Sequence, residues 1–208
     1  MSIRRISSSI FKHWSRQAPG LSDLFTTDKI EERLEQKAET LLVHGYKLDQ
    51  KGMPDAADTI YQQTIQYLEI YQAEQNHRVT SFTIGRIALR HGIHLYRLHR
   101  LAEARAAFNE AVLRFESMVT YDASLHTIDR LATSLRWLAN TKRLMGDLQK
   151  ARTTYLRAIA LYRQLIAFTV KQPVNLVYDR LMHSANIGLG KTIRQQRELT
   201  KQKKRLAT

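Results

Sequence analysis

The chain has 208 residues, with 33 lysines and arginines against 19 aspartates and glutamates, and it contains no cysteine. A chain of this length predicts one domain, and the lack of cysteine excludes disulfides, thiolate zinc sites and cysteine nucleophiles. No segment approaches the roughly 18 consecutive apolar residues that a membrane-spanning helix needs, and the first residues lack the apolar stretch of a secretory signal. The simplest expectation is a cytoplasmic protein, and the alternatives are the mitochondrial matrix and the periphery of a membrane.

At the N-terminus, residues 1–22 carry four basic side chains and no acidic one, which gives a net charge of +4. Apolar residues recur at helical spacing between positions 3 and 16, and the basic residues lie largely on other faces, which predicts a basic amphipathic helix. The apolar residues are Ile3, Ile6, Ile10, Phe11 and Trp14. Four interpretations remain open: a helix that caps the first repeat, an anchor at a membrane surface, a mitochondrial targeting segment and a disordered segment.

The rest of the chain predicts further helices, because apolar residues recur at helical spacing and the few glycines and prolines fall at element boundaries. The predicted helices are 28–50, 54–75, 78–99, 101–118, 124–145, 148–170 and 174–200. The fold class is therefore all-α. We expect an N-terminal segment over 1–22, a helical repeat domain over 23–189 and a basic C-terminal tail over 190–208.

One pattern occurs three times at an interval of 47 residues. Each copy has a small residue, an alanine twelve positions later, an aromatic four positions after that, and a threonine or alanine three positions further on. The four columns are Gly45, Gly92 and Ala139; Ala57, Ala104 and Ala151; Tyr61, Phe108 and Tyr155; and Thr64, Ala111 and Ala158. Small residues let two helices approach closely, and the aromatic fills the space between neighbours. A fixed period of this kind predicts a repeat architecture.

The pattern resembles the tetratricopeptide repeat, most clearly over residues 135–158, and the resemblance covers about residues 38–165. It implies a right-handed α-solenoid of about three helical hairpins, with an N-terminal segment and a C-terminal capping helix. The usual repeat has 34 residues, so a period of 47 predicts helices of roughly 20 residues. The period also fits HEAT and armadillo repeats, but the small and aromatic columns favour the tetratricopeptide type.

The resemblance also implies a ligand groove, because the first helix of each tetratricopeptide pair lines the concave face. The groove positions carried over by register are Leu42, Tyr46, Asp49, Arg86, Leu89, Arg90, Ile93, Tyr96, Arg97, Arg136, Trp137, Asn140 and Arg143. Family members often grip a ligand backbone with an asparagine at the position of Asn140. Its counterparts here are Tyr46 and Ile93, so the clamp for a terminal carboxylate is incomplete. An apolar floor ringed by arginines predicts an acidic or amphipathic protein segment as the ligand.

Charge is distributed unevenly along the chain. Residues 23–76 have a net charge of −6, residues 77–189 of +10 and residues 190–208 of +6. Such basic regions attract nucleic acid, anionic membrane surfaces or acidic proteins. The run Lys201, Lys203, Lys204 and Arg205 has no aromatic side chain for stacking on bases, and we expect this segment to be a solvated, frayed tail.

Enzyme motifs are incomplete. Residues 188–192 resemble the end of a phosphate-binding loop, but the required first glycine is replaced by Ala185 and no strand precedes it, so a helix is expected. His91, His94 and His99 lack the metalloprotease spacing and are interpreted as surface histidines. We therefore expect no catalysis, cofactor or metal site. The predicted function is a protein-binding adaptor, with self-association as a further option; the alternative is a nucleic-acid-associated accessory protein that uses the basic half and tails.

Overall fold

The computed structural model describes residues 27–75, 78–121, 123–170 and 172–206, and every helix or strand in these ranges is an α-helix. The helices are α2 (Thr27–Gln50), α3 (Pro54–Gln75), α4 (Arg78–Arg97), α5 (Leu101–Val119), α6 (Leu125–Leu144), α7 (Leu148–Phe168) and α8 (Asn175–Leu206). The all-α prediction is confirmed. The predicted helix ends agree within two residues, except that α8 continues six residues beyond position 200.

Residues 1–26 lie outside the described part of the chain, so the predicted helix over 3–16 and its apolar residues Ile3, Ile6, Ile10, Phe11 and Trp14 are not tested. None of the helices in the described ranges combines the length and the apolarity needed to cross a membrane.

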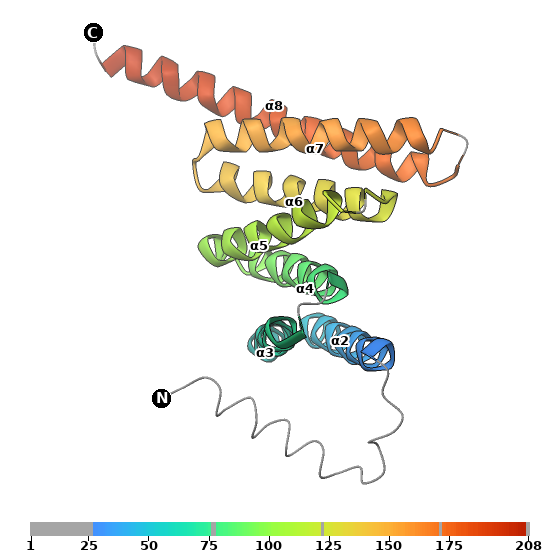
Figure 1. The fold of residues 1–208 in the computed structure, drawn as a ribbon. Coiled ribbons are helices and arrows are strands. Elements are labelled where there is room, and N and C mark those ends of the chain that lie inside the picture. Colours follow the sequence, from blue (N-terminus) through green and yellow to red (C-terminus); the bar gives the residue numbers. More distant parts are fainter. Residues whose placement is uncertain (1–26, 76–77, 122, 171, 207–208) are drawn as a thin grey trace, which may run out of the picture.

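The helices follow one another through the molecule in chain order, from α2 and α3 at one end to α7 and α8 at the other (Figure 1). Each helix packs against the next one along the chain. Helix α4 also contacts α2 and α6, and α6 contacts α8, whereas the odd-numbered helices make no contact of comparable extent with one another. The even-numbered helices therefore form a continuous face, which we call the even-helix face.

The turns that join α2 to α3, α4 to α5 and α6 to α7 repeat the same backbone geometry. Gly52, His99 and Gly146 have positive φ angles of 73°, 59° and 84°, and they lie 47 residues apart. In each turn the amide after this residue donates to a carbonyl five residues earlier: Met53 to Leu48, Arg100 to Leu95 and Asp147 to Lys142. This is the Schellman arrangement, which satisfies the last carbonyls of a helix. The turns define three hairpins: α2–α3, α4–α5 and α6–α7.

The repeated columns of the sequence are packed as predicted. Ala57, Ala104 and Ala151 have no exposed surface. A Cβ atom added at Gly45 would lie 2.9 Å from the ring of Tyr61, and one at Gly92 would lie 2.6 Å from the ring of Phe108. Only glycine leaves room for these aromatic rings, since real Cβ atoms essentially never approach so closely.

Residues 188–192 lie inside α8 and are helical, as expected. A Cβ atom at Gly188 would lie 2.5 Å from the hydroxyl of Tyr155, so this glycine allows α8 to pack closely on α7. The predicted frayed tail is wrong as far as Leu206, because α8 is regular up to that residue.

Candidate ligand-binding face

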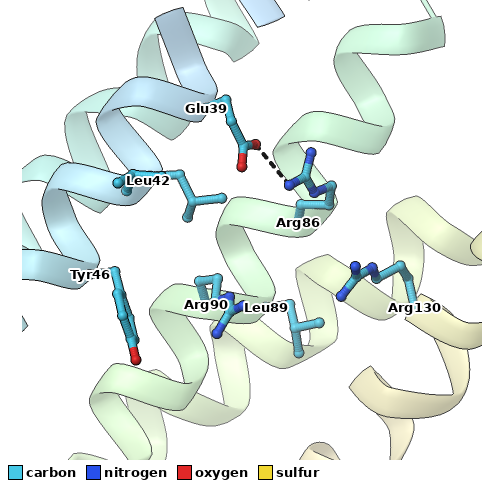
Figure 2. A pocket seen from close by; sticks show the side chains of 8 residues that line it. Glu39, Leu42, Tyr46, Arg86, Leu89, Arg90 and Arg130 are labelled. Atoms are coloured by element: carbon cyan, nitrogen blue, oxygen red, sulfur yellow. Dashed lines mark ion pairs between the residues drawn. The ribbon is translucent and has the colours of Figure 1, made fainter. Parts of the chain in front are cut away.

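A cavity of about 290 Å³ opens on the even-helix face, where α2, α4 and α6 meet (Figure 2). Its lining comes from three helices in turn: Glu39, Leu42, Val43 and Tyr46 from α2, Arg86, Leu89 and Arg90 from α4, and Arg130 from α6. Five of the positions expected in the groove, Leu42, Tyr46, Arg86, Leu89 and Arg90, are thus brought together around one space.

The cavity carries more positive than negative charge. Arg86 Nη2 lies 2.8 Å from Glu39 Oε2, so this acidic side chain compensates one arginine. The guanidinium of Arg90 lies 5.8 Å from the centre of the Tyr46 ring, in a cation–π arrangement. A cation over an aromatic face is stabilised by the ring quadrupole but stays positively charged. Arg90 and Arg130 therefore form no ion pair with a carboxylate that lines the cavity, although the charge of Arg130 acts on the neighbouring Asp129 of α6.

A second group of predicted residues continues the face toward α6. Tyr96 and Trp137 meet edge to face with ring centres 5.2 Å apart. The Arg136 guanidinium lies 5.1 Å from the centre of the Trp137 ring. Trp137 also stacks on the buried Phe108, and Ile93 is half buried against the same core, so these two side chains serve packing as well as lining the face.

Asn140 is already engaged within the protein. Tyr155 donates its hydroxyl hydrogen to Asn140 Oδ1 over 2.5 Å. Burial raises the pKa of Tyr155, while a hydrogen bond from Arg143 acts in the opposite direction. One of the two lone pairs of the Asn140 carbonyl oxygen is therefore occupied by Tyr155, and this bond fixes the orientation of the amide.

Arg97 and Asp49 do not contribute to the cavity. Arg97 Nη1 lies 3.0 Å from Asp49 Oδ2, and the other oxygen of this carboxylate lies 2.9 Å from His94 Nδ1. The two groove candidates neutralise each other and tie the end of α2 to the end of α4.

Sequence reasoning missed Glu39, Val43 and Arg130 as lining residues. Arg130 has no basic counterpart one repeat earlier, where Thr83 stands, so the column comparison gave no signal. It does precede Trp137 by seven residues, and this spacing places both on one helical face. The signal was therefore available from the helical period of α6.

Three guanidinium groups of α6 share an unusual feature. The Nε atoms of Arg130, Arg136 and Arg143 are buried and have no hydrogen-bond partner among the described residues. Buried polar atoms are normally paired. No carboxylate of the described chain forms an ion pair with Arg90 or with any of these three arginines.

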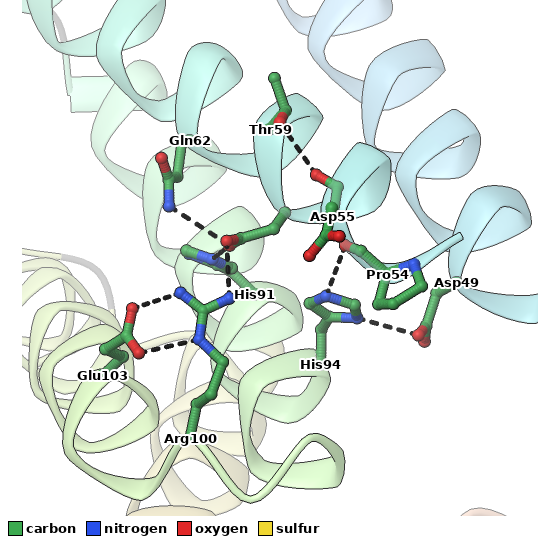
Figure 3. Close-up of polar contacts among 10 residues, drawn as sticks. Asp49, Pro54, Asp55, Thr59, Gln62, His91, His94, Arg100 and Glu103 are labelled. Atoms are coloured by element: carbon green, nitrogen blue, oxygen red, sulfur yellow. Dashed lines mark hydrogen bonds and ion pairs between the residues drawn. The ribbon is translucent and has the colours of Figure 1, made fainter. Parts of the chain in front are cut away.

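The interpretation of His91 and His94 as surface residues is wrong, because they are 8% and 1% exposed. His91 Nε2 lies 2.5 Å from Asp58 Oδ1, and Arg100 Nη1 lies 2.8 Å from Asp58 Oδ2. Figure 3 shows His91 and His94 side by side between α3 and the start of α5, with Arg100 reaching toward Glu103. His94 Nε2 lies 3.1 Å from the carbonyl oxygen of Pro54.

The environments of Asp58 and His91 shift the pKa of both groups. Burial raises the pKa of Asp58, but the hydrogen bonds from Arg100 and His91 and the charge of Arg100 outweigh burial, and the net effect lowers the pKa. Burial lowers the pKa of His91 despite the neighbouring Asp58. A neutral His91 therefore donates a hydrogen bond to an ionised Asp58. No group of His, Asp and Glu side chains in the described ranges is arranged to hold a metal ion.

Comparisons with protein-family models, with curated proteins and with solved structures gave no match to this chain. The interpretation of the even-helix face consequently depends on its own geometry. The face has an open cavity lined by three arginines and one glutamate, followed by an aromatic and arginine-rich stretch on α4 and α6.

Proposed function

We propose that the protein is a non-catalytic scaffold of the tetratricopeptide-like type, a right-handed solenoid of three hairpins, whose even-helix face binds an acidic segment of a partner protein. Two observations support the repeat arrangement. The left-handed turn residues recur every 47 positions, and the even-numbered helices contact one another along one side.

One observation carries the ligand assignment. Arg90 and Arg130 line the cavity, Arg136 and Arg143 follow further along α6, and none of these four arginines has an ion pair with a described carboxylate. Arginines at neighbouring positions that form no ion pair repel one another. A ligand that supplies carboxylates removes this repulsion, and the guanidinium fork matches a carboxylate with two hydrogen bonds.

The aromatic residues of the face indicate that the ligand has apolar residues as well as acidic ones. Tyr46 is 43% exposed beside Arg90, and Trp137 and Tyr96 lie half buried beside Arg136. Aromatic side chains with apolar faces and adjacent cations suit a segment that alternates apolar and acidic residues. An amphipathic acidic helix presents this alternation on one side and fits into a groove between helices.

The proposal is tested by reversing charge at the cavity. Arg90→Glu combined with Arg130→Glu should abolish binding to an array of acidic amphipathic peptides while the helical circular dichroism signal is retained. The matched control reverses two exposed arginines of α7, with Arg152→Glu and Arg163→Glu, and should bind as the wild type does. Equal binding by both double variants would show that the cavity is not the ligand site.

A further inference from the structure

The end of α8 departs from the repeat that the other even-numbered helices follow. Helices α2, α4 and α6 end at Gln50, Arg97 and Leu144, which are 47 residues apart. One further step of 47 residues falls on Lys191, but α8 continues to Leu206. The additional residues 192–206, which we call the α8 extension, add about 22 Å of helix at the usual rise per residue.

The local cause of the extension is a missing turn residue. The positions of Gly52, His99 and Gly146 correspond to Ile193, which does not have a positive φ angle. A β-branched residue strongly disfavours the left-handed conformation that ends the earlier helices. The backbone therefore continues as a helix, and no partner helix folds back over it within the described chain.

The charge of the extension is almost entirely positive. Its acidic residue is Glu198, and its basic residues are Arg194, Arg197, Lys201, Lys203, Lys204 and Arg205. All of these side chains are exposed. At 100° per residue, five of the six basic positions fall on the same side of the helix, with Lys203 on the opposite side. Cations in the last turn also interact favourably with the helix dipole. The row of basic residues begins at Arg194, about three turns before the helix ends, so the dipole does not account for all of it.

Comparison with the earlier hairpins shows that the extension lacks the acidic counterparts found there. Asp58 pairs with Arg100 at 2.8 Å, and one repeat later Arg105 pairs with Asp147 at 3.4 Å. The corresponding positions one repeat further on are Arg152 and Arg194, which are both basic. The ion pair that joins successive hairpins thus has no equivalent between Arg152 and Arg194, and both of these side chains are exposed.

The side chains of the α8 extension favour one class of anionic partner over the others. Residues 192–206 contain no aromatic side chain for stacking on single-stranded bases. Their apolar residues, Ile193, Leu199 and Leu206, do not form the broad apolar face that a membrane-surface helix requires. What remains is a helix about 10–12 Å in diameter with five cations along one side and Lys203 on the other. A B-form major groove is about 12 Å wide, admits an α-helix and has phosphates on both sides.

We propose that the α8 extension binds the phosphate backbone of double-stranded nucleic acid without reading its sequence. This interaction is independent of the acidic-segment site, because the two surfaces share no residue. About six phosphate contacts should make the affinity fall about 10³-fold between roughly 50 and 200 mM salt.

The test measures fluorescence anisotropy of labelled DNA and RNA duplexes of about 20 base pairs and mixed sequence, with the full chain and over this salt range. The variant Arg197→Gln, Lys201→Gln, Lys204→Gln keeps good helix formers. It should reduce the slope of log affinity against log salt by about 2.7, since each contact contributes about 0.9. At the lowest salt it should bind at least about tenfold more weakly.

The matched control removes three exposed charges elsewhere, with Lys47→Gln, Lys51→Gln and Arg163→Gln. It should retain the wild-type slope and bind within about twofold of the wild type. Binding to either duplex with this pattern supports the proposal. Equal losses in the two triple variants, or an unchanged slope in the α8 variant, would overturn it. The proposal also fails if the extension binds anionic vesicles or polyglutamate but neither duplex.

Discussion

The interface between the first and second hairpins and the interface between the second and third are built from the same register but with different chemistry. At the first, His91 and His94 lie against Tyr61, with ring centres 5.7 and 5.8 Å apart. One repeat later the same two positions are Leu138 and Thr141, both buried. The first interface is therefore polar and titratable, and the second is largely apolar.

The apolar cores follow this division. One cluster of buried residues joins α2, α3 and the first half of α4, and it includes Tyr61, Leu68 and Ile84. A larger cluster extends from α4 to α7 and includes Phe108 and Leu135. The repeat thus conserves backbone geometry while leaving the chemistry of each interface free to change. Since the cavity lies between α2, α4 and α6, its shape depends on the polar interface.

The largest expected effect is at the apolar interface. Phe108→Ala removes a fully buried ring that fills the space over Gly92. It should lower the free energy of unfolding by about 3–5 kcal/mol, as other large-to-small core substitutions do. Urea denaturation followed by circular dichroism measures this change. Leu113→Ala on the same helix, where the side chain is 61% exposed, is the control and should cost less than about 1 kcal/mol.

The next prediction compares two positions that are equivalent by register. Asp58→Ala leaves His91 and Arg100 without their shared acceptor and should cost about 1–3 kcal/mol. Arg105→Ala breaks the corresponding ion pair of the second interface, where both partners are well exposed, and should cost less than about 1 kcal/mol. Similar denaturation midpoints for the two variants would contradict the distinction between the interfaces.

A pH series sharpens the same distinction. The folded pKa of His91 is lowered by burial, so the unfolded chain binds the proton more readily, and stability is lost as the pH falls below the ordinary histidine pKa. The lowered pKa of Asp58 acts in the same direction at more acidic pH, because protonation then favours unfolding. Thermal unfolding between pH 7 and 5 should therefore depend less on pH in His91→Gln than in the wild type. An identical pH dependence would show that His91 does not titrate with folding.

The smallest effect concerns the turns. His99 holds a φ of 59° where the equivalent residues are Gly52 and Gly146. The left-handed conformation costs a non-glycine residue about 1–2 kcal/mol, which glycine avoids. Glycine is also more flexible in the unfolded chain, and this offsets about 0.5–1 kcal/mol of the stabilisation. His99→Gly should therefore stabilise the protein by up to about 1.5 kcal/mol, measured by thermal unfolding. Gly146→Ala is the reverse control and should destabilise it.

Helix positions and the small and aromatic columns could be predicted because they depend on local periodicity. The environment of the histidines could not, since the partners Asp58 and His91 are 33 residues apart and nothing near either residue indicates the other. The same reason explains why Arg86 and Arg97 were expected to be available to a ligand: their acidic partners Glu39 and Asp49 lie on another helix. Pairing across helices is a property of the packed fold.

The length of α8 was underestimated for a different reason. A basic, polar segment without apolar periodicity predicts a solvated tail, and charge alone does not show whether such a segment continues a preceding helix. Helix propensity offered a better signal. The strong helix formers Lys, Arg, Gln, Glu and Leu dominate residues 194–206, and this segment contains neither glycine nor proline.

The claim that the even-helix face binds acidic segments is tested most directly by site-specific photocrosslinking. A benzophenone amino acid placed at Val43, which is 42% exposed at the cavity, is compared with one at Leu113 on α5. We predict that segments crosslinked at Val43, identified by mass spectrometry, are rich in Asp and Glu and are lost when Arg90→Glu and Arg130→Glu are introduced. Segments of ordinary composition, or equal crosslinking at the two positions, would contradict the proposal.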